Sequence, residues 1–232
     1  TEALGHEKEA LAAYDEIMAT GDRPAAAKAN LLQLTLRQKR HEISPEEATV
    51  GLETLQMTWR GDTVELQTLQ QLTRIYADSS RPRDAFAAAR MATRLSPNSE
   101  VSRQIQDESS ALFAKLFLSS KGDELSTVEA LGLFYDYREL TPIGRRGDEL
   151  IRRLSDRLVG IDLLDQAADL LQYQVDRRLE GAARAQVASR LATIYLMNRK
   201  PDRAAGVLRA TRVADLAGEL RQQRLLLEAR AQ

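Results

Sequence analysis

The sequence has 232 residues, of which 43% are hydrophobic, and 33 basic against 34 acidic side chains give a net charge of −1. This balance lacks the basic excess of a nucleic-acid binder, and the lack of cysteine excludes disulfides and thiolate metal sites. No segment approaches the run of about 18 apolar residues that a membrane helix needs, so we expect no membrane insertion. Arginine outnumbers lysine, which suggests a bacterial source. The lack of cysteine leaves both the cytoplasm and the periplasm open as the compartment.

Apolar residues recur at helical spacing between polar turns, as in Leu69, Leu72 and Tyr76, and strand-like alternation is absent. Capping boxes at Ser44–Glu47 and Ser126–Glu129 mark two helix starts. Together these signals predict a chain of eleven to twelve helices. In order, the predicted ranges are 6–20, 25–41, 45–59, 63–79, 82–95, 99–119, 126–139, 147–159, 163–178, 182–198, 201–211 and 214–230.

Gly-Asp pairs recur at the predicted turns. They begin at Gly21, Gly61, Gly122 and Gly147. Glycine accepts the left-handed conformation past a helix end, and aspartate can cap the helix that follows. We therefore predict a helix end and a helix start at each pair.

An alanine recurs early in alternate predicted helices. It occupies positions Ala10, Ala48, Ala85, Ala130, Ala167 and Ala204, at intervals of 38, 37, 45, 37 and 37 residues. A period in this range is typical of stacked helix pairs, in which each unit packs mainly on its neighbours. The alanine is expected where the two helices of a pair approach closely. The whole chain, 1–232, is therefore interpreted as one repeat array.

The long interval locates an irregular unit at residues 99–142, with a long first helix and a polar linker at 119–125. Five of the eleven aromatic residues of the sequence lie in this unit. They are Phe113, Phe117, Phe134, Tyr135 and Tyr137. One interpretation is packing between the longer helices, and the other is an apolar cluster on which a partner docks.

Two segments carry a pattern of apolar, small, aromatic and alanine residues at fixed offsets. In residues 69–97 it reads Leu69, Leu72, Thr73, Tyr76, Ala85, Ala89, Ala92 and Pro97. In residues 188–216 it reads Ala188, Leu191, Ala192, Tyr195, Ala204, Leu208, Thr211 and Leu216. The pattern resembles a tetratricopeptide repeat, although the period exceeds the family's usual 34 residues. The resemblance implies an all-α, right-handed α-solenoid of antiparallel helix pairs.

In that family the first helix of each pair lines a concave groove. Carried onto this sequence, the resemblance predicts groove positions rich in amides and guanidiniums. They are Asn30, Gln33, Arg37, Gln67, Gln70, Gln71, Arg74, Arg152, Arg153, Gln186, Ser189 and Arg190. Amides can bond the backbone of an extended peptide, and arginine suits carboxylates. The alternative is an ordinary solvated face. The lysine and asparagine of the family's chaperone-tail clamp are replaced, which disfavours that ligand.

Residue patterns for catalysis are weak. His6 and His41 have no partner at metal-ligand spacing, and no glycine-rich phosphate loop follows a strand. Paired carboxylates such as Glu46 and Glu47 lie in first helical turns, where they complement the helix dipole. We therefore predict no catalytic residue, metal or cofactor, and expect that the chain is not an enzyme.

Two functions fit these observations. The first is a protein-interaction module that binds a protein or an extended peptide in the groove. The second is a structural spacer or assembly subunit of a bacterial envelope or export complex, which acts through its ends and convex surface and for which a homo-oligomer is one possible state. Both ends resemble half units, so we expect a segment of a longer protein, and the last helix is either a cap or the first helix of another pair.

Overall fold

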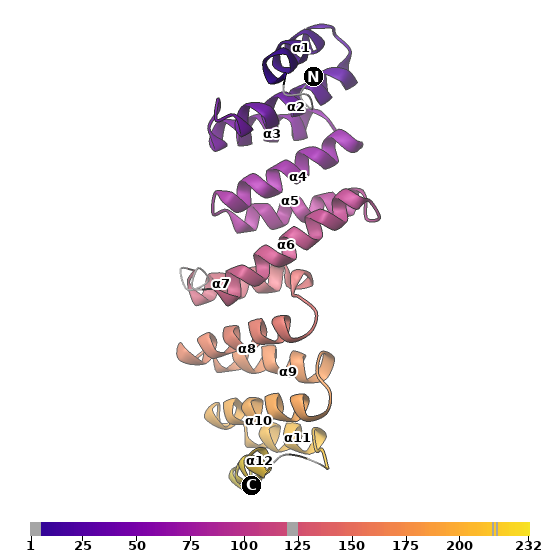
Figure 1. The fold of residues 1–232 in the computed structure, drawn as a ribbon. Coiled ribbons are helices and arrows are strands. Elements are labelled where there is room, and N and C mark those ends of the chain that lie inside the picture. Colours follow the sequence, from indigo (N-terminus) through magenta and orange to yellow (C-terminus); the bar gives the residue numbers. More distant parts are fainter. Residues whose placement is uncertain (1–5, 120–124, 215, 217) are drawn as a thin grey trace. The chain divides into compact units, whose positions relative to one another are not determined.

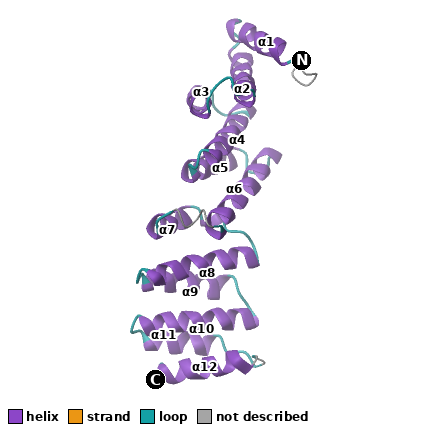
Figure 2. Ribbon diagram, turned by 60° about the vertical axis from the view of Figure 1, so that its left-hand side comes forward, coloured by secondary structure: helices purple, strands orange, loops and turns teal. Residues whose placement is uncertain are grey.

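The computed structural model describes residues 6–119, 125–214, 216 and 218–232 and consists, in those residues, of twelve α-helices without a strand (Figures 1 and 2). One short 3-10 helix, η3 (Arg138–Leu140), accompanies them. The α-helices are α1 (Glu7–Ala19), α2 (Arg23–Lys39), α3 (Pro45–Thr58), α4 (Thr63–Asp78), α5 (Pro82–Leu95), α6 (Glu100–Leu118), α7 (Thr127–Asp136), α8 (Arg145–Gly160), α9 (Leu164–Arg177), α10 (Gly181–Met197), α11 (Pro201–Ala210) and α12 (Gly218–Arg230). The predicted all-α class is confirmed.

The chain divides into two compact units, Thr1–Leu112 and Phe113–Gln232, whose boundary falls inside α6. In unit 1, α1 packs on α2, α4 on α5, and α3 on both α2 and α4. In unit 2, α8, α9, α10 and α11 each pack on the next helix, and α12 packs on α10 and α11. Even-numbered helices are called first helices below, and odd-numbered helices second helices.

The recurring alanine has the same place in every second helix. Ala10, Ala48, Ala85, Ala130, Ala167 and Ala204 are each the fourth residue of their helix, and each is 0% exposed. Each donates its backbone N–H to the carbonyl of the residue before the helix, as Ala85 does to Arg81 at 3.1 Å. The predicted close-approach position is thus fully enclosed in all six second helices.

Most predicted helix boundaries agree with the structure to within two or three residues. Both capping boxes are confirmed: Ser44 and Ser126 each accept the backbone N–H of the glutamate three residues later. The helix predicted at 126–139 ends earlier, at Asp136, and η3 follows it. The Gly122 turn and parts of the predicted 119–125 linker and 214–230 helix lie outside the described residues.

Turns into first helices and turns into second helices differ in which residue adopts the left-handed conformation. The turns that lead into α2, α4, α8 and α10 use a glycine at positive φ, as at Gly61 (φ 91°), where Asp62 then accepts the backbone N–H groups of Val64 and Glu65 and caps α4. The turn into α6 contains no glycine. Turns that lead into a second helix place a non-glycine residue at positive φ. These residues are His41, Ser80, Asp162 and Arg199. Among the fully described turns, glycine at positive φ therefore marks only those into α2, α4, α8 and α10.

The prediction for Gly147 was wrong. The left-handed glycine of this turn is Gly144 (φ 75°), α8 already begins at Arg145, and Gly147 is buried in its first turn. A Cβ at Gly147 would lie 1.9 Å from the Pro142 carbonyl oxygen. Arg178 fixes this contact, because its Nη2 donates to the same oxygen at 2.8 Å and its Nε to Asp148 at 2.9 Å. Close packing, and not a turn, requires this glycine.

Replacement of two helical glycines should have opposite effects. We expect Gly147→Ala to lower the free energy of unfolding by about 2–3 kcal/mol, because the methyl group overlaps a held backbone carbonyl. Gly206→Ala in α11 should raise it by about 0.5–1 kcal/mol, because its Cβ meets no atom within 4 Å and alanine favours helix. Urea unfolding followed by circular dichroism measures both; equal effects would contradict this account.

Candidate functional site

The first helices of unit 2 enclose a polar cavity of about 320 Å³. Four of the predicted groove residues line it: Arg152 and Arg153 from α8, and Gln186 and Arg190 from α10. The structure adds side chains that the prediction did not include. They are Glu149, Asp156, Val187 and Gln223. We call this the first-helix groove of unit 2.

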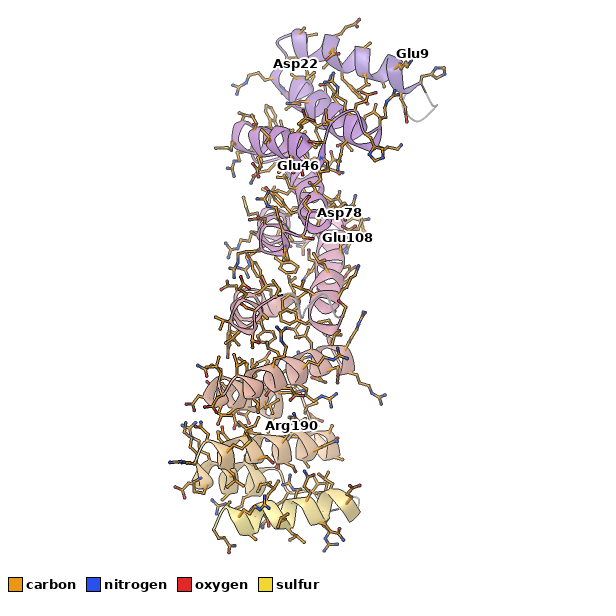
Figure 3. The ribbon with its side chains drawn as sticks, turned by 90° about the vertical axis from the view of Figure 1, so that its left-hand side faces the viewer. Glu9, Asp22, Glu46, Asp78, Glu108 and Arg190 are labelled. Carbon is orange, nitrogen blue, oxygen red and sulfur yellow. The ribbon has the colours of Figure 1, made fainter. Side chains whose placement is uncertain are left out.

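Carboxylates pair with every arginine that lines this groove. Arg190 on α10 (Figure 3) bonds Asp156 on α8, while Arg152 and Arg153 both bond Glu149. Arg153 also donates to the Leu118 carbonyl at 2.7 Å. With three guanidiniums and two carboxylates, the lining keeps one net positive charge. It is therefore not a simple anion site.

Unit 1 joins its first helices in the same way. Arg74 on α4 binds Glu108 on α6 (Figure 3) through two hydrogen bonds of 3.1 and 2.7 Å, and these bonds raise the pKa of Arg74. One turn earlier, Gln70 donates to Gln104 at 3.4 Å. The predicted groove arginine Arg74 is thus already engaged within the chain.

The sequence prediction missed the partners of these groove residues because each partner lies on the next first helix, at a spacing that differs from the repeat period. Gln70 with Gln104, Arg74 with Glu108, and Asp156 with Arg190 are each 34 residues apart. The first residues of α4 and α6 are 37 residues apart. A spacing of 34 is three residues shorter, so the facing residues lie almost one helical turn out of the repeat register. A search for complementary polar residues at 34 would have found them.

The other predicted groove residues differ in accessibility. Ser189 is buried and bonds the Ala185 carbonyl at 3.0 Å, and buried Gln33 donates to Asp15 at 2.6 Å. Neither presents a free group to a ligand. The remaining four are partly exposed. They are Asn30, Arg37, Gln67 and Gln71.

Most of the aromatic cluster belongs to the core of unit 2. Phe113, Phe117 and Phe134 lie with ring centroids 4.7–6.3 Å apart, and all three are buried, as is Tyr137. Tyr135 packs its ring edge against Phe134 at 5.8 Å and is 45% exposed. Four of the five rings therefore contribute to packing, and Tyr135 alone offers surface to a partner.

Two tyrosines at equivalent positions join second helices to first helices. Tyr76 donates its hydroxyl to Glu53 at 2.5 Å, and Tyr195 donates to Gln172 at 3.1 Å. Burial raises the pKa of both tyrosines, and the bond to Glu53 raises that of Tyr76 further. Ala85 and Ala204, nine residues later, are fully buried beside them in the pattern that the sequence predicted.

In the part of the chain that the structure describes, no group of three or more histidine, aspartate or glutamate residues could hold a metal ion. No helix among the described residues is both long and apolar enough to cross a membrane. His6 lies 3.3 Å from Glu9 near the start of α1, and His41 lies in the turn after α2.

No protein-family model matches the sequence, and neither does any curated protein. Solved structures are similar in arrangement. BtubC from P. vanneervenii is 14% identical, with 96% of this chain and 92% of that chain covered and a TM-score of 0.37. MamA from Desulfovibrio magneticus RS-1 is 18% identical, with 91% and 98% covered and a TM-score of 0.34. A tetratricopeptide repeat protein from Parabacteroides merdae is 11% identical, with 98% and 91% covered and a TM-score of 0.38.

The described residues form an all-α fold of repeated helix pairs. First and second helices alternate, each second helix encloses an alanine, and in two pairs a tyrosine precedes that alanine by nine residues.

Loss of the Tyr76 hydroxyl should change how stability depends on pH. A tyrosine whose folded pKa is raised contributes stability below the unfolded pKa of about 10 and loses it as pH rises further. We expect Tyr76→Phe to cost about 1 kcal/mol at pH 7 and to flatten the decline of unfolding free energy above pH 10. Urea titrations at pH 7 and from pH 9 to 11 measure this.

Tyr173→Phe, which alters an exposed tyrosine on α9, is the matched control and should follow the wild-type curve. Parallel curves for wild type and Tyr76→Phe above pH 10 would contradict the assignment.

Proposed function

We propose that the chain is a protein-interaction scaffold that holds an extended segment of a protein partner against its first helices. In unit 2 the receiving surface is the first-helix groove. The observation that carries the proposal is its cavity of about 320 Å³, lined by polar side chains of α8, α10 and α12. A cavity of this size accepts side chains of a peptide.

The chemistry of the groove favours recognition of a peptide backbone. Gln186 and Gln223 are exposed, and neither makes a hydrogen bond to the described part of the chain. Each amide offers two donors and an acceptor, the complement of an extended backbone. The single excess positive charge favours one acidic side chain in the bound segment. The Asp156–Arg190 ion pair holds α8 and α10 together and pre-organises the surface.

Peptides selected on the purified protein test the groove. An extended-peptide display library supplies ligands, and fluorescence anisotropy measures their affinity for variants. Gln186→Glu should weaken binding about tenfold, because it replaces a donor amide by a carboxylate that repels carbonyl oxygens. Gln186 is exposed and unbonded, so the substitution should leave the unfolding curve unchanged.

Arg209→Glu is the control, since it changes charge on an exposed position of α11 outside the groove. If selected peptides bind Gln186→Glu as tightly as wild type, or bind Arg209→Glu equally weakly, the groove does not hold them.

One observation favours the alternative, a spacer or assembly subunit that associates through its second helices. In unit 1, Val50 and Met57 on α3 are 62% and 75% exposed, and Met91 on α5 is 39% exposed. Gln56 donates to the Met91 sulfur at 3.7 Å and links the two helices there. Apolar side chains grouped in this way are typical of contact surfaces.

Sedimentation velocity over a range of concentrations distinguishes this alternative. A self-associating chain should lose its larger species when Met57→Glu places a charge in the contact, while Gln186→Glu should leave association unchanged. A wild-type chain that sediments as a monomer at every concentration would exclude self-association through this surface.

A further inference from the structure

A second cavity, of about 370 Å³, lies between α9, α10 and α11 and shares no residue with the first-helix groove. We call it the α9–α11 cavity. Its apolar wall is formed by Val175, Val207 and Ala210, and its polar wall by Arg184 and Arg203, together with Gln172, Asp176 and Tyr195. Gly206 lies at its edge, and a Cβ there would meet open space.

The same chain provides a counterpart of the segment that forms this cavity. Residues 45–95 (α3 to α5) align with 164–214 (α9 to α11) without a gap, so that Pro82 corresponds to Pro201 and Tyr76 to Tyr195. Even the left-handed residues of the turns, Ser80 (φ 57°) and Arg199 (φ 55°), coincide. The helix starts therefore correspond, whereas α5 continues to Leu95 and α11 ends at Ala210, the position of Met91.

Those side chains differ in size. Ala210 and Gly206 occupy the positions of Met91 and Ala87. Gln56 on α3 donates to the Met91 sulfur on α5, a link between the two helices that Val175 and Ala210 cannot make in unit 2. Small residues on α11 therefore border the α9–α11 cavity.

The side chains also differ in charge. Unit 1 places three carboxylates at Glu53, Glu65 and Asp84, each engaged within the chain. The corresponding residues of unit 2 are Gln172, Arg184 and Arg203. Three acidic positions of unit 1 therefore correspond to one neutral and two basic positions in unit 2, while Asp176 stands where unit 1 has the neutral Met57.

Neither cavity arginine forms an ion pair with a carboxylate among the described residues. Asp165 on α9 lies near Arg203, but its carboxylate is already bonded by Lys200 and Asn198, and Lys200 contributes most to its lowered pKa. Arg184 donates Nε to the Val175 carbonyl at 2.9 Å, which fixes its guanidinium at the wall. Arg203 lies over the Tyr195 ring, 5.9 Å from its centroid. Asp176 is the one acidic residue of the lining, and Gln172 donates to it at 2.9 Å. The lining therefore keeps one net positive charge beside an apolar wall.

We propose that the α9–α11 cavity binds a carboxylate carried on a short apolar chain, with Arg184 and Arg203 pairing the carboxylate and Val175, Val207 and Ala210 contacting the chain. Guanidiniums pair with carboxylates through charge-assisted hydrogen bonds. A small organic acid and the carboxyl terminus of a peptide share this chemistry. The site is independent of the first-helix groove.

Nuclear magnetic resonance titrations with hexanoate test the site. Hexanoate should shift the methyl signals of Val175 and Val207 in a saturable manner, and hexan-1-ol and hexylammonium should bind about tenfold more weakly or not at all. Arg203→Gln should weaken hexanoate binding about tenfold, whereas Arg209→Gln, on the same helix but outside the cavity, should not change it.

Gly206→Leu provides a second variant that fills the cavity without a clash at Cβ and should abolish binding. The peptide acetyl-Ala-Ala-Leu with a free carboxyl terminus, compared with its amide, identifies the source: tighter binding than hexanoate assigns the site to a peptide end, and weaker binding to a free acid. Equal binding of hexanoate and hexan-1-ol, unchanged binding to Gly206→Leu, or no saturable shift with any carboxylate would overturn the proposal.

Discussion

The close approach of a second helix at its fourth residue is the constraint on which the rest of this structure depends. Six alanines occupy that position, and none exposes any surface. A methyl group is the largest side chain found there, since closely packed interiors have little room for additional atoms. The backbone N–H of each alanine also donates to the carbonyl of the residue before the helix and so closes the first helical turn. The start of each second helix and its contact with the neighbouring helix are therefore fixed by one residue.

With the pairs fixed in this way, polar side chains of successive first helices meet one another. Arg74 with Glu108 and Arg190 with Asp156 are roughly half exposed, so each ion pair contributes at most about 1 kcal/mol. Their larger effect is on recognition, because an engaged guanidinium is not free to bind an anion. The binding chemistry left on this face is that of unbonded amides such as Gln186 and Gln223, which is suited to backbone groups and not to charge alone.

The sequence predicted what depends on local spacing and missed what depends on contact between helices. Apolar periodicity and capping serines placed the helices, because both act within a few residues along the chain. Gly147 was misinterpreted as a turn because a glycine required by an approaching carbonyl has the same letter as a glycine required by positive φ. Ser189 was placed in the groove by the family resemblance, yet it bonds the backbone of its own helix and is buried. Glu108 was missed because facing residues do not share the repeat register.

The comparison of α3–α5 with α9–α11 separates the scaffold from its chemistry. Tyrosine, proline and alanine coincide at Tyr76 and Tyr195, Pro82 and Pro201, and Ala85 and Ala204, where they fix the helix pair. Charge and volume differ around them, at positions that the pair does not need for packing. Because the fold accepts Asp84 in one copy and Arg203 in the other, the charge at this position is not fixed by packing and can match a ligand. Function in such an array is therefore better sought where two equivalent backbones differ than where they agree.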